Sequence, residues 1–148
     1  MRRFVTFTAA TVALALGLGV TGSALASTTK TRHFTSTFLG ASVSSNENVY
    51  DVRGSGLRGA AVQFVKVNKA GTAGSDTLTA YDGQGSIVDQ DSFTLSAPKN
   101  GIITITGSGH FVRGTGKYVQ ISGSYTFRGT ENTKTGVIKV TATGTESY

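Results

Sequence analysis

Apolar and polar residues alternate with a period of two after residue 27, and this alternation limits the fold more than any other feature. In YVQISGSYTFR (118–128), one face would carry Val119, Ile121, Tyr125 and Phe127. Residues 136–145, GVIKVTATGT, repeat the pattern. Successive side chains of a strand point to opposite faces, so the pattern predicts strands with one buried face. No segment after residue 27 shows helical spacing of convincing length.

About eight short segments have this strand pattern, with turn residues between them. Asp82-Gly83 supplies the positive-φ turn that a tight hairpin favours. Evenly spaced strands separated by turns are typical of a sandwich or a barrel. The polar stretch SVSSNEN (42–48) is interpreted as a connection. The predicted strands are 33–39, 60–67, 75–81, 85–89, 91–95, 101–107, 118–128 and 136–145.

The glycine-rich stretch 107–125, GSGHFVRGTGKYVQISGSY, allows two interpretations: a phosphate-binding loop or a sharply bent pair of strands. The earlier GSGLRG (54–59) matches G-x-G-x-x-G literally, but a strand pattern follows it where a dinucleotide site needs a helix. GTGK (114–117) lacks the earlier glycine of a phosphate loop, because position 111 is Phe111. Glycine in a strand marks a bulge or a corner. We therefore predict a bent strand pair.

The first 26 residues have the pattern of a secretory signal peptide. Arg2 and Arg3 precede a short apolar run, and Ala24-Leu25-Ala26 predicts cleavage after Ala26. The expected product is a secreted, extracellular single β-barrel domain over residues 27–148, with no membrane span in the mature chain. The chain has no cysteine, so no disulfide is expected. After residue 26, twelve Lys and Arg exceed eight Asp and Glu by four, and this surplus is spread along the chain, which does not indicate nucleic-acid binding.

Residues 114–123, GTGKYVQISG, resemble the glycine signature of dirigent proteins and of the related allene oxide cyclase barrels. NGIITITG (100–107) precedes the signature and NTKTGVIKVTATGTESY (132–148) follows it, as in that superfamily. The resemblance covers mainly residues 100–148. It implies an all-β, closed antiparallel barrel of about eight strands, with an apolar cavity that receives hydrophobic small molecules and steers a cyclisation or radical coupling. Ser122 stands where dirigent chains usually carry arginine, and no catalytic residue is carried over.

Candidate ligand-binding residues come from the aromatic side chains and from two polar segments. Aromatic residues of small barrels are more often core or cavity wall than exposed strips. Tyr50 and Arg53 follow Glu47 and Asn48 in a segment that we expect near the barrel mouth, and His110 begins the bent strand. We therefore predict that the barrel interior or mouth is lined by Tyr50, Arg53, Phe64, Phe93, His110, Phe111, Tyr125 and Phe127.

Carboxylates gather around one predicted hairpin, at Asp82, Asp89 and Asp91. Aspartates beside glycine are usual in turns, and the segment lacks the spacing of a calcium loop. The only other histidine besides His110 is His33, near the start of the predicted domain, so the histidines do not suggest a metal site. We predict no metal site and no cofactor.

Three functions from different classes remain open. The first is a secreted barrel that binds an apolar small molecule. The second is a cyclase or isomerase that confines a reactive substrate, and the third is a structural or interaction protein of the cell surface. A connected cavity of roughly 300 Å³ or more favours the first two, and a filled interior favours the third. The polar outer positions neither demand nor forbid a homo-oligomer.

Overall fold

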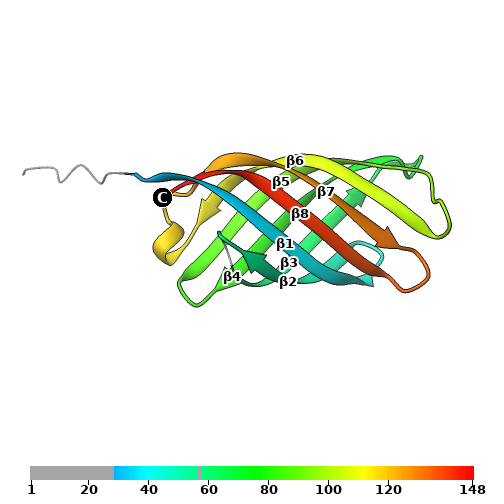
Figure 1. Ribbon diagram of the computed structural model, residues 1–148, viewed down its shortest axis with the longest axis horizontal. Coiled ribbons are helices and arrows are strands. Elements are labelled where there is room, and N and C mark those ends of the chain that lie inside the picture. The colour runs from blue at the N-terminus through cyan, green and yellow to red at the C-terminus, as the bar shows by residue number, and fades with distance from the viewer. Residues whose placement is uncertain (1–28, 57) are drawn as a thin grey trace, which may run out of the picture.

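The computed structural model describes residues 29–56 and 58–148, which form a closed barrel of eight antiparallel strands and one short 3-10 helix (Figure 1). The predicted signal peptide lies outside the described residues. The elements are β1 (Thr31–Ser44), β2 (Glu47–Gly54), β3 (Gly59–Val67), β4 (Ala73–Asp82), β5 (Gly85–Leu95), β6 (Ile102–Gly114), η1 (Gly116–Tyr118), β7 (Ser122–Asn132) and β8 (Val137–Ser147).

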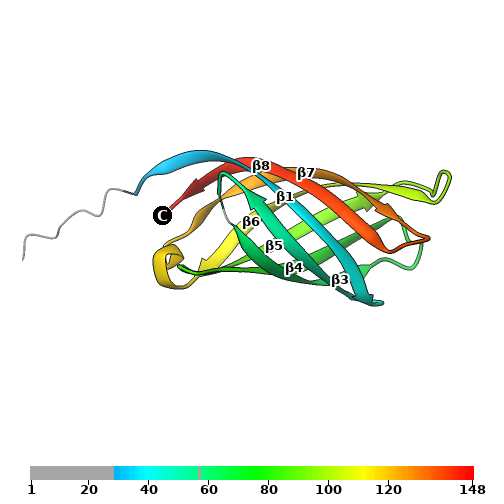
Figure 2. The same ribbon diagram turned by 60° about the horizontal axis from the view of Figure 1, so that its bottom comes forward.

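Each strand pairs with its neighbours in the sequence, and β8 pairs with β1 to close the ring. The closing pair runs from Thr31 opposite Ser147 to Ala41 opposite Val137. Figure 2 shows the ring continuing through β3, β4 and β5 on a second side. Closure leaves no unpaired strand edge, which is how an all-β domain avoids edge-to-edge association. The predicted closed antiparallel barrel is confirmed.

The predicted and observed strand counts agree only because two errors cancel, and β1 and β6 are also longer than predicted. The strand β2 occupies part of the segment interpreted as a polar connection. The two predicted strands at 85–89 and 91–95 are one continuous strand, β5. Gln90, the residue left between the two predicted strands, is an exposed residue on the outer face of β5. In β2, buried Tyr50 and Val52 alternate with exposed polar residues, which hid the strand pattern.

The prediction of a strand from Tyr118 onward is wrong. Gly116, with a φ of 58°, opens η1, and β7 begins only at Ser122. Tyr118 is buried in the apolar core, with its hydroxyl donating to Asp82 Oδ2 at 2.6 Å, whereas Val119 is exposed. The local turn at η1 therefore determines which of these residues are buried, and the period-two alternation does not predict it.

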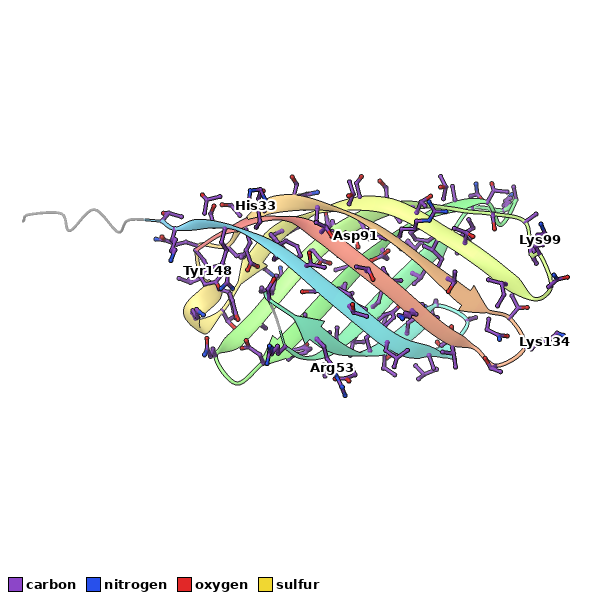
Figure 3. The ribbon with its side chains drawn as sticks, in the orientation of Figure 1. His33, Arg53, Asp91, Lys99, Lys134 and Tyr148 are labelled. Atoms are coloured by element: carbon purple, nitrogen blue, oxygen red, sulfur yellow. The ribbon has the colours of Figure 1, made fainter. Side chains whose placement is uncertain are left out.

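The barrel has two distinct ends. We call the end that carries the β1–β2, β3–β4, β5–β6 and β7–β8 connections the loop end, and the other the terminal end, because Tyr148 lies there beside η1 and the β4–β5 turn (Figure 1). Lys99 and Lys134 mark the loop end in Figure 3. No helix in residues 29–56 or 58–148 is long and apolar enough to cross a membrane.

Side chains of alternate residues fill much of the barrel. Val52 and Ile138 belong to one buried apolar cluster, and an aromatic cluster surrounds Tyr125. The Tyr125 ring centroid lies 5.4 Å from that of Phe111 and 6.0 Å from that of Phe34. Aromatic pairs at such separations add to the stability that burial supplies.

The glycines of the stretch 107–125 make room inside the barrel. The strands β6 and β7 are paired from Ile102 opposite Asn132 to His110 opposite Ser124, so the stretch is a strand pair with a turn and forms no phosphate loop. A Cβ at Gly107 would collide with the Phe127 ring, and one at Gly109 would collide with Asp91 Oδ1. Large inward side chains on the neighbouring strands therefore require glycine here.

Candidate ligand cavity and aspartate cluster

A cavity of about 180 Å³ lies inside the barrel toward the loop end. All eight strands contribute to its wall. Most of the wall is apolar, formed by Phe38, Val65, Leu78, Phe93, Ile105, Phe127, Ile138 and Val140. Ser42, Ser45 and Asn46 lie at its β1–β2 rim. The alternation of the strands thus produces an apolar chamber with a polar rim.

One side of the cavity carries a small hydrogen-bonded polar group. Gln63 Oε1 accepts hydrogen bonds from the Tyr50 hydroxyl at 2.7 Å and from Asn48 Nδ2 at 2.8 Å. Burial, followed by the charge of Asp76, raises the pKa of Tyr50 above its ordinary value. The Tyr50 hydroxyl therefore stays protonated and remains a donor at neutral pH.

Three aspartates meet beside this cavity. Asp76 on β4 is directly opposite Asp91 on β5, and Asp89 precedes Asp91 by two residues on the same face. One carboxylate oxygen from each of the three lies within 4.8 Å of the others. Asp76 and Asp91 line the cavity of about 180 Å³, while Asp89 lines a smaller one of about 30 Å³ toward Phe34 and Phe111. The aspartate cluster therefore lies between the two cavities.

The aspartate cluster is deeply buried and incompletely hydrogen-bonded. Asp76 is 5% exposed and Asp89 is 4% exposed. Tyr125 donates its hydroxyl to Asp91 Oδ1 at 2.7 Å. Neither carboxylate oxygen of Asp76, nor Oδ1 of Asp89, makes a hydrogen bond to any described residue. Buried polar atoms are nearly always hydrogen-bonded, so these three are exceptions that require an explanation.

Burial also shifts the titration of the aspartate cluster. It raises the pKa of Asp76 to about 6, with the Gln63 amide acting in the opposite direction. Burial raises the pKa of Asp89 and of Asp91, and the charge of Asp89 raises the pKa of Asp91 further. The Tyr125 phenol has its pKa raised by burial and by these two carboxylates. Without a compensating cation, the cluster therefore holds protons at a pH where ordinary aspartates have lost them.

The residues predicted to line the barrel interior or mouth divide into two groups. Tyr50, Phe93, Tyr125 and Phe127 line the larger cavity. Phe111 lies inside the barrel next to the smaller cavity.

Arg53, Phe64 and His110 lie on the outer face, which corrects their expected position. Arg53 pairs with Asp51 at 2.8 Å and points away from the barrel (Figure 3). Phe64 is 54% exposed, because β3 turns Ala61, Gln63 and Val65 inward. Because Phe64 and Val65 are adjacent apolar residues, the sequence did not show which of them faces the barrel interior.

The polar residues Gln63, Asp76 and Asp89 were not among the predicted cavity residues. A signal for the aspartates was present, because Asp76 shares the period-two face of Leu78 and Ala80. Asp89 and Asp91 likewise share the face of Ile87 and Phe93. Figure 3 shows Asp91 between the two ends of the barrel, far from any turn.

Comparisons of the chain with protein-family models, with curated proteins and with solved structures found no match. The barrel agrees with the fold that the dirigent-like signature implies, and membership of that family stays a prediction.

Proposed function

We propose that this protein binds a compact, largely apolar small molecule in the cavity at the loop end of the barrel. The observation that carries the proposal is the largely apolar cavity with polar groups on one side, which is the usual character of a small-molecule site. A barrel filled by side chains, the structural alternative, would lack this chamber.

The cavity volume limits the size of the ligand. At about 180 Å³, it is below the roughly 300 Å³ that we expected of a ligand-binding barrel and at which drug-sized sites begin. It is slightly larger than an apolar cavity of about 150 Å³ that holds benzene. A ligand of about one substituted ring fits these limits.

The polar groups of the cavity limit the chemistry of the ligand. The wall includes Asn48, Tyr50, Gln63 and the carboxylates, and no lysine, arginine or histidine of the described residues lines it. An anionic ligand would therefore meet no countercharge, whereas an alcohol, a phenol or an amine would meet hydrogen-bond acceptors. The dirigent-like signature, which implies hydrophobic ligands, and the predicted signal peptide support a binding role outside the cell.

Native mass spectrometry of protein recovered from its own secretion medium tests the proposal. We expect a retained small molecule that is released on unfolding. Val65→Phe, which would fill the cavity, should weaken rebinding of that molecule at least about tenfold. Val49→Phe on the outer face of β2 is the matched control and should bind as the original protein does.

Two results would overturn the binding proposal. One is the absence of any retained molecule across several growth conditions, and the other is equal binding by both variants. Recovery of the added molecule as an isomer would replace simple binding with the cyclase or isomerase alternative, which would use the same cavity.

A further inference from the structure

We propose that Asp76, Asp89 and Asp91 form a binding site for a hard divalent cation of the calcium, magnesium or manganese class inside the barrel. The observations are the convergence of three carboxylates from two adjacent strands and the buried, unpartnered oxygens of Asp76 and Asp89. The inference is independent of the proposed small molecule and departs from the expectation of no metal site.

The strand register brings the three carboxylates together unavoidably. Asp76 and Asp91 are directly opposite in the β4–β5 pair, and Asp89 is the next inward residue along β5. Like charges directly opposite one another in a sheet are destabilising. The destabilisation is removed when a cation shares their oxygens.

Within residues 29–56 and 58–148, no cationic side chain pairs with the aspartate cluster. The ion pairs of the described residues are Arg32–Glu146 and Arg53–Asp51, and neither involves the cluster. The polar partner of the cluster is the Tyr125 hydroxyl, which donates to Asp91. Three oxygens of Asp76 and Asp89 have no partner. An unpaired buried carboxylate is strongly unfavourable, and a metal ion is one of the few groups that satisfies it.

The ligand atoms and their spacing indicate the class of ion. All are oxygens, which suits hard cations and disfavours ions that prefer sulfur or nitrogen. Oxygens bind Ca²⁺ at about 2.3–2.6 Å, so two oxygens on opposite sides of the ion lie about 5 Å apart. The oxygens of the aspartate cluster lie within 4.8 Å of one another, which is compatible with one shared ion.

The surroundings supply the remaining parts of such a site. Asp76 and Asp91 line the cavity of about 180 Å³, which gives a route of entry and room for waters that complete the coordination. The Tyr125 hydroxyl holds Asp91 in place, as outer groups orient the ligands of metal sites.

Titration of the EDTA-treated full chain with calcium, magnesium and manganese chlorides tests the proposal. Calorimetry should show one ion per chain for at least one of the three metals, and the melting temperature should rise with its concentration. Terbium(III) gives a second readout, because Tyr125 adjoins the site and the chain has no tryptophan. Tyrosine-sensitised terbium luminescence should appear and should be displaced by the bound metal.

Substitutions assign the ion to the aspartate cluster. Asp89→Asn should weaken binding at least about tenfold while leaving the circular dichroism spectrum of a β protein. Asp51→Asn, on the outer face, is the control and should bind normally. If Asp89→Asn does not fold, Asp76→Asn serves in its place. Absence of binding by the folded original protein for all three metals, or unchanged binding by the cluster variant, would overturn the proposal.

Discussion

The barrel buries carboxylates in two places and treats them differently. At the terminal end, Glu146 is 2% exposed, and its Oε1 accepts a hydrogen bond from Arg32 Nε at 2.6 Å. Arg32 also donates to the Tyr148 hydroxyl and lies 5.0 Å from the centroid of that ring. At mid-barrel, the aspartate cluster has no cationic partner among the described residues.

The comparison distinguishes a buried carboxylate that is paired within the protein, Glu146, from buried carboxylates that can still bind an external group, those of the aspartate cluster. Arg32 pairs with Glu146, so this buried carboxylate needs no external partner. The aspartate cluster remains incomplete beside a cavity, so it is the place where an external group gains most by binding. The predictions below test this contrast.

The largest expected effect is a loss of stability with rising pH in the absence of divalent metal. The folded state keeps protons on the aspartate cluster after the unfolded chain has lost them, so stability is full below the ordinary pKa of 3.8 and falls as pH rises through about 6 for Asp76. The raised pKa values of Asp89 and Asp91 extend the fall upward. We expect a loss of at least about 3 kcal/mol, measured by urea unfolding in EDTA.

The control for this pH dependence is the triple variant Asp76→Asn, Asp89→Asn and Asp91→Asn. The unfolding free energy of this variant should depend much less on pH, because the titrating carboxylates have been removed. An equal slope in both proteins would show that the dependence arises elsewhere in the chain.

A smaller loss is expected from Arg32→Met at the terminal end. Removing the partner of a buried carboxylate leaves an uncompensated charge, and because Arg32 is 36% exposed we expect a loss of about 2 kcal/mol. Adding Glu146→Gln should restore much of the stability, and urea unfolding of both variants measures it. A stability equal to that of the original protein would mean that Glu146 does not depend on this pair.

At the aspartate cluster, by contrast, removing a charge is expected to stabilise the metal-free protein. Asp76→Asn should raise the unfolding free energy of the metal-free protein by roughly 1–2 kcal/mol at pH 7, because it removes a buried negative charge opposite Asp91. The gain is limited since the amide is still short of partners. Thermal and urea unfolding give the value, and a destabilised variant would count against the contrast.

The smallest expected effect comes from Gly109→Ala. The new methyl group would displace the Asp91 carboxylate and press on the Tyr125 ring, lowering stability by about 1 kcal/mol. Gly83→Ala is the matched control, because a Cβ at Gly83 has no atom within 4 Å. Melting temperatures of the two variants provide the comparison, and equal values would show that β5 and β6 relax around the added methyl group.

The sequence predicted the regular parts of this molecule well and its polar interior poorly. The alternation in residues 136–145 identified the inward side chains Ile138, Val140 and Ala142, which the structure confirms. Tyr125 and Phe127 were placed inward for the same reason, whereas Phe93 was chosen as an aromatic residue and Tyr50 from the segment expected near the barrel mouth, and all four line the cavity. Asp89 was included in a predicted strand but was interpreted as a carboxylate near a hairpin and left out of the predicted cavity, because a buried carboxylate contradicts the usual preference.

By itself, the sequence determined an all-β chain whose glycines let the strands bend, because strand periodicity and glycine placement are local properties that each segment carries without its neighbours. Only the tertiary structure decided that Asp76 opposes Asp91, that Gly109 makes room for it, and that a cavity remains beside them. Those relations depend on strand register and on closure of β8 onto β1, which are set by the packing of the whole barrel.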